Sequence, residues 1–133
     1  REFGIPERGA VFIYCGKLIE VKRPLDAVRG FAGACRGAEA SLVLVGDGPL
    51  DAVVRAEAET LGIAEQVIFL GFRNQSELPK IYGCCDALVL PSNHENWGLV
   101  VNEAMACGLA IATSHHVGAA AEQARANEKE PER

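Results

Sequence analysis

The chain has 133 residues, 49% hydrophobic and 23% charged, which is enough for one globular domain with a substantial core. Its formal net charge of −5 gives no support for binding to nucleic acid or to an anionic membrane surface. No apolar run approaches the ~20 residues that a transmembrane helix needs, and the start carries no signal-peptide pattern. We therefore predict a cytoplasmic domain, or one trimmed from a larger protein, in which any peripheral membrane contact would come from a part missing here.

Apolar runs typical of buried strands alternate with helical stretches along the chain. The predicted strands are Ala10–Cys15, Ser41–Val45, Val67–Leu70, Asp86–Leu90 and Leu109–Thr113. The predicted helices between them are Pro24–Cys35, Pro49–Leu61, Ser76–Cys84 and Gly98–Cys107. Fully apolar strands separated by helices favour a parallel sheet covered on both faces, so we expect an α/β, Rossmann-like fold. We place this domain at residues 1–122 and a polar tail at 123–133.

The five cysteines form neither a Cys-x-x-Cys pair nor a zinc pattern, and their odd number indicates a reducing compartment. Four of them fall in apolar runs, and we expect small buried side chains rather than catalytic or redox groups at Cys15, Cys84, Cys85 and Cys107. The three histidines make no convincing metal set, since two of them are adjacent. The sequence therefore predicts no metal site.

Ligands of parallel α/β sheets bind beyond the carboxyl ends of the strands, so the loops that follow the strands are where a site is expected. The first such loop, residues 16–23, carries cations at both of its ends, including Lys17 and Lys22. Beside the amino terminus of a helix these cations could clamp a diphosphate. Exposed lysines are more often only solvated, so this loop needs support from a second element.

The loop before the fourth predicted helix supplies that second element. Glu95 lies in the loop beside His94, and Glu103 lies on the second turn of the helix. The turn around Gly98, with Leu99 and Val100, offers free backbone N–H groups to a phosphate, so both carboxylates fit better as acceptors for sugar and ribose hydroxyls. The same eight-residue interval between glutamates occurs twice more in the chain, and the spacing alone therefore carries no weight.

The turn Gly46-Asp47-Gly48-Pro49 resembles half of a dinucleotide-binding fingerprint. It lacks the third glycine and is weak support for NAD. The chain has no Gly-Lys-Ser/Thr and no Gly-x-Ser-x-Gly, which excludes a P-loop and a hydrolase nucleophile of that type.

Five landmarks in order give the chain a resemblance to a known family. They are Gly16-Lys17-Leu18 followed by Lys22, the turn from Val45 to Pro49, Phe69-Leu70-Gly71, Pro91-Ser92, and the Glu95/Glu103 element that continues to Gly108. From about Phe3 to Glu122 the chain resembles the carboxyl-terminal, donor-binding domain of a group 1 (family 4) retaining glycosyltransferase with the two-domain GT-B architecture.

The resemblance implies a role for each matching residue. Lys17 and Lys22 neutralise the nucleotide diphosphate, Glu103 bonds the ribose, and Glu95 contacts the donor sugar. The remaining donor-binding residues are Gly16, Gly98, Leu99 and Val100, with Phe72 and Arg73 beside the base and His94 lining the site. Lys17 stands where the family commonly has Arg, which keeps the charge and loses the bidentate fork.

The resemblance also implies retaining glycosyl transfer from a nucleoside diphosphate sugar, in glycan or polysaccharide biosynthesis, without a metal or other cofactor. The acceptor-binding amino-terminal domain of the family is missing, so we expect the chain to bind the nucleotide sugar and to transfer no sugar alone. Two alternatives stay open. One is a nucleotide-binding module without catalysis, and the other is a sugar-nucleotide epimerase or glycan phosphorylase of the same architecture.

Overall fold

The computed structural model describes residues 3–91 and 98–113, and they form one parallel sheet with helices on both faces. Five strands make the sheet: β1 (Ala10–Cys15), β2 (Ala40–Val45), β3 (Val67–Gly71), β4 (Ala87–Leu90) and β5 (Ala110–Thr113). Four α-helices follow the first four strands: α1 (Pro24–Cys35), α2 (Asp51–Thr60), α3 (Leu78–Tyr82) and α4 (Gly98–Ala106). Two 3-10 turns, η1 (Glu20–Lys22) and η2 (Ala64–Gln66), precede α1 and β3.

The strands lie in the order β3-β2-β1-β4-β5, and every pair is parallel. The longest register joins β1 and β2, where six residues of each strand face one another. The chain therefore winds outward from β1 to β3, crosses to the other side of β1, and continues through β4 to β5. This order confirms the α/β, Rossmann-like fold expected from the alternation of apolar runs, and it places a reversal of strand order between β1 and β4.

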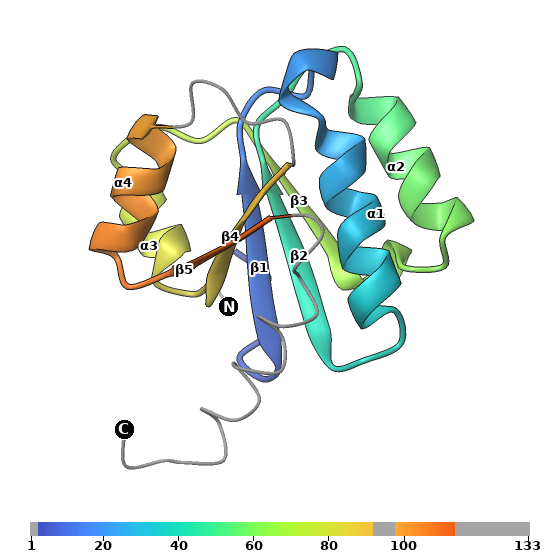
Figure 1. Cartoon of the computed structure of the whole chain (residues 1–133), viewed down its shortest axis with the longest axis horizontal. Helices are drawn as coiled ribbons and strands as arrows, with labels where there is room; N and C mark the ends of the chain where they lie inside the picture. Colours follow the sequence, from blue (N-terminus) through green and yellow to red (C-terminus); the bar gives the residue numbers. More distant parts are fainter. Residues whose placement is uncertain (1–2, 92–97, 114–133) are drawn as a thin grey trace.

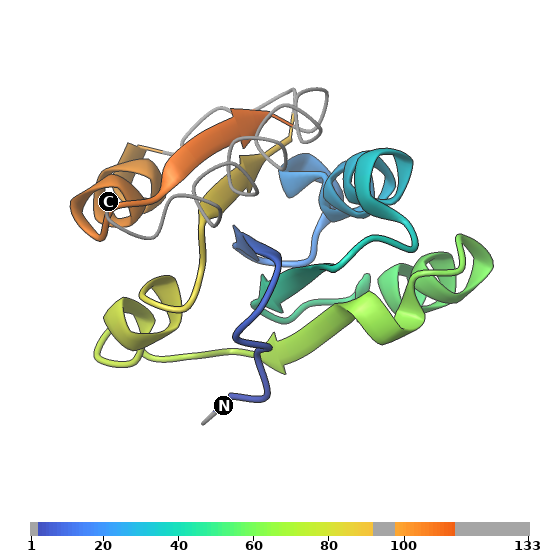
Figure 2. The same ribbon diagram turned by 90° about the horizontal axis from the view of Figure 1, so that it is seen from below.

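The helices divide between the two faces of the sheet. Figures 1 and 2 agree that α1 and α2 lie side by side on one face, while α3 and α4 cover the other. The three strands β1, β2 and β4 are buried along their whole length, as strands covered on both faces should be. An edge-to-face contact between Phe12 and Phe31, with ring centroids 6.0 Å apart, joins β1 to α1.

Two predicted helices are shorter than expected. We predicted Pro49–Leu61 and Ser76–Cys84, and the structure has α2 at Asp51–Thr60 and α3 at Leu78–Tyr82. Pro49 lies before α2 and not in its first turn. Residues 74 to 77 form a turn, in which the Glu77 backbone N–H donates to the Asn74 carbonyl at 3.0 Å, and α3 starts only after this turn. The bond from Glu77 to Asn74, like that from Leu78 to Gln75, spans three residues, whereas an α-helical bond spans four.

The prediction that four cysteines are buried is right for Cys15 alone. Cys15 is buried, but Cys84 and Cys107 are exposed and Cys85 is half-buried. The two exposed thiols lie in turns that end α3 and α4, and an apolar neighbour in sequence does not bury a residue at the end of a helix. Within the described part of the chain no helix is long and apolar enough to cross a membrane.

Candidate functional site

The reversal of strand order predicts a site at the end of the sheet where the strands finish, called here the carboxyl end. The loop after β1, residues 16–23, and the loop that leads into α4 leave the sheet on either side of this reversal. A crevice outside the carboxyl ends of two such strands is where open α/β sheets bind their ligands. Glu95 and His94 belong to the loop before α4 and lie outside the described residues.

A cavity of about 190 Å³ opens at this end of the sheet. Gly16 and Lys17 line it from the loop after β1, and Phe72 and Arg73 line it from the loop after β3. The structure thus brings together four of the predicted site residues from segments more than fifty residues apart in the chain. The rest of the wall consists of Cys15, Val45, Gly46, Asp47 and Leu78.

Three loops are tied together around this cavity by backbone hydrogen bonds. The Gly16 N–H donates to the Val45 carbonyl at 2.9 Å, and the Leu18 N–H donates to the Asp47 carbonyl at 3.0 Å. The Gly46 N–H donates to the Gly71 carbonyl at 2.7 Å, which adds the loop after β3. The floor of the cavity is therefore a continuous backbone network at the ends of β1, β2 and β3.

The Gly46-Asp47-Gly48 turn is explained by this close approach and not by a dinucleotide. Gly46 has φ +136°, and a Cβ atom at this position would lie 1.9 Å from the Gly16 carbonyl oxygen. A Cβ atom on Gly48 would lie 2.7 Å from the Leu18 carbonyl oxygen. Only glycine lets the loop after β2 pass against the loop after β1.

Arg73 is fixed in the cavity wall by three contacts. Its Nε donates to the Leu70 carbonyl at 3.1 Å, and its guanidinium donates to the Glu77 carboxylate at 3.3 Å. The Phe3 ring lies beneath the guanidinium, 5.4 Å from it. Phe72, by contrast, is 69% exposed, so a large apolar ring stands at the rim of the cavity without being packed.

Glu103 joins α4 to the loop after β3. Its carboxylate accepts a hydrogen bond from the Gln75 side-chain amide at 3.0 Å. Burial raises the pKa of the Cys15 thiol at the end of β1, and the negative charge of Glu103 raises it further. The Glu103 carboxylate is thus held against the loop after β3, which also carries Phe72 and Arg73 of the cavity wall.

The other predicted residues take the following places. Gly98, Leu99 and Val100 form the first turn of α4, where backbone N–H groups have no partner inside the helix. Leu99 is 66% exposed and Val100 is half-buried. Lys22 ends the 3-10 turn η1 directly before α1. Among the residues that the structure describes, no group of three His, Cys, Asp or Glu side chains could hold a metal ion.

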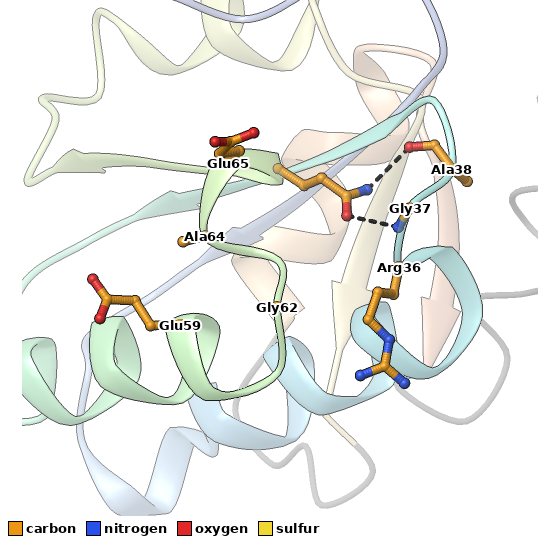
Figure 3. A pocket seen from close by; sticks show the side chains of 8 residues that line it. Arg36, Gly37, Ala38, Glu59, Gly62, Ala64 and Glu65 are labelled. Atoms are coloured by element: carbon orange, nitrogen blue, oxygen red, sulfur yellow. Dashed lines mark hydrogen bonds between the residues drawn. The ribbon is translucent and has the colours of Figure 1, made fainter.

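A larger cavity, about 570 Å³, lies at the opposite, amino end of the sheet, where β2 and β3 begin. Figure 3 shows its labelled wall, with Arg36 and Glu59 directed away from each other. Its polar groups bond within the protein. The Gln66 amide accepts from the Gly37 N–H at 3.0 Å and donates to the Cys35, Ala38 and Ala40 carbonyls at 2.9 to 3.1 Å, and Arg36 donates to the Leu61 carbonyl.

Sequence reasoning missed two residues of the carboxyl end. Gln75 was not singled out, and no local pattern marks it, because its partner Glu103 comes 28 positions later. Tyr14 was not singled out either, although a signal was present. It is the residue with a polar tip in the otherwise apolar strand AVFIYC, directly before the cation-bearing loop.

Comparison with known proteins gives a consistent result. Residues 1–130 match the model of the family described as glycosyl transferases group 1. Over 109 residues the chain is 37% identical to N-acetyl-alpha-D-glucosaminyl L-malate synthase of Bacillus anthracis, an alignment that covers 82% of this chain and 28% of that protein. The chain spans only 28% to 30% of the length of three such curated relatives.

Solved structures show the same similarity. HepE of Anabaena, solved in complex with UDP-glucose, superposes with a TM-score of 0.69 at 28% identity, over 80% of this chain and 30% of that one. The catalytic domain of cholesterol-alpha-glucosyltransferase from Helicobacter pylori superposes with a TM-score of 0.76 over 92% of this chain and 90% of that one. At 20% identity, this second match shows a shared fold alone.

Proposed function

Because the chain belongs to the glycosyl transferases group 1 family, we propose that it binds the nucleoside diphosphate sugar for a retaining glycosyltransferase of glycan or polysaccharide biosynthesis. The observation that carries the proposal is the cavity at the carboxyl end of the sheet, where Gly16, Lys17, Phe72 and Arg73 meet beside the reversal of strand order. The HepE structure, which holds UDP-glucose, supports the same class of ligand.

In this proposal the base lies in the cavity at the ends of β1, β2 and β3, and the diphosphate extends from there toward the amino terminus of α4. The exposed Phe72 ring offers an apolar face to the base, and Lys17 and Lys22 meet the diphosphate. The Glu103 carboxylate, exchanging its Gln75 partner for a hydroxyl, accepts from the ribose. Glu95 and His94 would complete the sugar end of the site.

Glycosyl transfer from a nucleoside diphosphate sugar requires that the departing diphosphate be stabilised. During transfer the bond between the anomeric carbon and a diphosphate oxygen breaks, and the oxygen keeps the electron pair, so negative charge grows on the leaving group. The two lysines and the amino terminus of α4, at Gly98 to Val100, offer positive charge and N–H donors to that group. No step in this description requires a metal ion or another cofactor.

For the 133 residues themselves the proposal is donor binding. Transfer is proposed for a protein of the relatives' length, of which this chain covers 28% to 30% in three cases. Closure of a second domain over the donor normally completes such a site and excludes water. Robust sugar transfer by the 133-residue chain would overturn this division.

Isothermal titration calorimetry with UDP, GDP and ADP tests the proposal. At least one of them should bind with a dissociation constant below about 1 mM, which corresponds to about 4 kcal/mol. Lys17→Ala should weaken that binding about tenfold, whereas Lys80→Ala, which removes an exposed lysine from α3, should leave it unchanged. Lys17→Arg should keep the affinity or raise it, because a guanidinium can bond phosphate through two N–H groups.

Each result of this titration has a clear meaning. If no nucleoside diphosphate binds at millimolar concentration, the proposal fails. If one binds but Lys17→Ala and Lys80→Ala weaken it equally, the ligand is attracted by general charge and the assigned site is wrong. If full-length relatives of the chain bind a nucleoside diphosphate but transfer no sugar, the alternative of a nucleotide-binding module is favoured.

A further inference from the structure

The Tyr14 hydroxyl is buried under the loop that carries both lysines. Tyr14 is fully buried in β1, one residue before the strand ends. Its hydroxyl donates toward the backbone carbonyl of Lys17 at 2.9 Å and lies 3.3 Å from the backbone carbonyl of Lys22. A single side chain of the strand thus contacts the two positions of the loop that the proposed function assigns to the diphosphate.

The direction of the Tyr14 side chain follows from the strand. Successive side chains of a strand point to opposite faces, so Tyr14 shares a face with Phe12. Phe12 packs on Phe31 of α1, and Tyr14 therefore points to the α1 face, beneath the turn that enters the helix. Figure 1 shows the chain leaving β1 and turning through this short loop into α1 on that face.

The other contacts described for the loop each hold one of its two halves. Leu18 is held to the loop after β2 by two backbone hydrogen bonds of 3.0 Å, one through its N–H and one through its carbonyl. The 3-10 turn is closed locally by hydrogen bonds of 3.0 Å from Lys22 to Ile19 and from Arg23 to Glu20. Among the contacts described for this loop, the Tyr14 hydroxyl is the group that reaches both Lys17 and Lys22.

The hydroxyl keeps its proton under ordinary conditions. Burial raises the pKa of Tyr14 far above its usual value, and the neighbouring Cys15 raises it further. A tyrosine hydroxyl has one proton, which the two carbonyls share. The contact therefore stays a donor to the loop across the physiological pH range.

We propose that Tyr14 is a positioning residue for the donor, whose hydroxyl fixes the backbone at Lys17 and Lys22 so that the two ammonium groups meet one diphosphate. The inference rests on the proposed function, because it assigns a purpose to the spacing of those lysines. It adds a residue that touches no ligand itself and acts through the loop.

The chain offers a matched pair of variants, because Tyr14 and Tyr82 are its two tyrosines. Both are almost fully buried, and the Tyr82 hydroxyl lies beside the Cys15 thiol, on the other side of β1 from the loop that carries the lysines. Tyr14→Phe removes a hydroxyl that bonds the loop, while Tyr82→Phe removes one that does not. Both substitutions keep the aromatic ring and its packing.

The first measurement is backbone hydrogen exchange without ligand. In Tyr14→Phe the amides of Leu18, Lys22 and Arg23 should exchange at least about fivefold faster than in the unsubstituted chain, which corresponds to the loss of about 1 kcal/mol of local stability. In Tyr82→Phe the same amides should keep their rates. Unchanged exchange of these amides in Tyr14→Phe would overturn the inference.

The second measurement compares binding of UDP, inorganic pyrophosphate and uridine. Tyr14→Phe should weaken UDP and pyrophosphate about five- to tenfold and leave uridine unchanged, because only the diphosphate meets the lysines. Tyr82→Phe should change none of the three. A merely structural role for Tyr14 would weaken uridine equally, and that result would overturn the inference.

The two proposals fail in different ways. If the unsubstituted chain binds none of UDP, GDP and ADP, the proposed function fails, and the inference about the diphosphate fails with it. If UDP binds the unsubstituted chain and Tyr14→Phe equally well, the proposed function survives and Tyr14 loses its role as a positioning residue.

Discussion

The cavities at the two ends of the sheet are lined by similar charged residues, but these residues have different roles. The amino end has the larger cavity, about 570 Å³, with one arginine and two glutamates in its wall. The carboxyl end has a cavity of about 190 Å³ with a lysine, an arginine and an aspartate. At the amino end Gln66 and Arg36 bond the backbone that joins α1, α2 and β2. Cavity size therefore does not identify the site, because the amino end uses its polar groups to hold the fold together.

At the carboxyl end, side chains take a smaller part in holding the loops together. There the loops are joined mainly by backbone groups, through Gly16, Leu18 and Gly46, which leaves Lys17 and Phe72 directed to solvent. Backbone hydrogen bonds need no side chain, so a site built on them can vary its side chains without losing its shape. The difference between the two ends shows that a binding site can be recognised by polar and aromatic side chains that are not needed to hold the loops together.

Alanine substitution of a crowded glycine at the carboxyl end and of an open glycine at the amino end should give the largest contrast in stability. Gly46→Ala places a Cβ atom 1.9 Å from the Gly16 carbonyl oxygen, and we expect the free energy of unfolding to fall by about 3 kcal/mol or more. Gly37→Ala at the amino end has φ +79° and no atom within 4 Å of the added Cβ, so it should cost about 1 kcal/mol. Urea denaturation measures both, with Gly33→Ala in the open face of α1 as a neutral or stabilising control. Equal losses at Gly46 and Gly37 would contradict the close packing of the loops.

Removal of the Gln66 side-chain amide at the amino end should lower stability without changing ligand affinity. Gln66→Ala deletes four hydrogen bonds to backbone groups between Cys35 and Ala40, and we expect a loss of about 2 kcal/mol in the free energy of unfolding. The affinity for UDP should stay within about twofold of the unsubstituted chain. A tenfold loss of UDP affinity in the folded variant would instead place the ligand at the amino end.

High pH should destabilise both ends. Burial raises the pKa of Tyr14 and Cys15 at the carboxyl end and of Cys85 at the amino end, above ordinary values of 10.0 for tyrosine and 9.0 for cysteine. These groups keep their protons in the folded chain and lose them in the unfolded chain above those values, so stability is complete below pH 9 and falls as the pH rises further. Each such group contributes up to about 1.4 kcal/mol per pH unit.

Urea midpoints between pH 8 and pH 11 check this sign. Cys85→Ala should flatten the fall, because it removes one group that ionises only in the unfolded chain. Stability that rises between pH 9 and pH 11 would contradict the burial of these groups.

The smallest effect concerns thiol reactivity and leaves stability unchanged. Cys84 at the amino end and Cys107 after α4 are exposed and should react with iodoacetamide in the folded chain, whereas buried Cys15 should not. Peptide mapping after labelling at pH 8 measures each site. Rapid labelling of Cys15 would show that the wall of the carboxyl-end cavity opens to solvent.

Much of the fold could be predicted because its determinants are local. The helix from Pro24 to Cys35 was predicted to the residue, since Pro24 suits the first turn and the apolar positions repeat at helical spacing. Gly62 and Gly108 end their helices with φ of +76° and +89°, as their type and position indicated. The prediction failed at the start of α3, where backbone bonds from Glu77 to Asn74 and from Leu78 to Gln75 form turns that span three residues in place of the first helical turn.

Less of the site could be predicted from the sequence. Gly16, Lys17, Phe72 and Arg73 were all identified, and the structure places them around one cavity. The roles assigned to them, and to Glu103, remain predictions, as do Glu95 and His94 outside the described residues and the division of the chain at residue 122. The bond between Gln75 and Glu103 was not expected, because nothing in either segment specifies the other.

By itself the sequence determined the alternation of strands and helices, the family, and the positions of the cations and carboxylates in strand-to-helix loops, because periodicity, caps and motifs act over a few neighbouring residues. Only the tertiary structure decided which loops meet. The order β3-β2-β1-β4-β5 brings Gly46 against Gly16, a contact that depends on pairing between strands thirty residues apart. Tyr14 reaches Lys17 and Lys22 within eight residues, but only the path of the loop from β1 into α1 places its hydroxyl beneath both. These contacts distinguish the end of the sheet proposed to hold the donor from the end whose polar groups hold the fold.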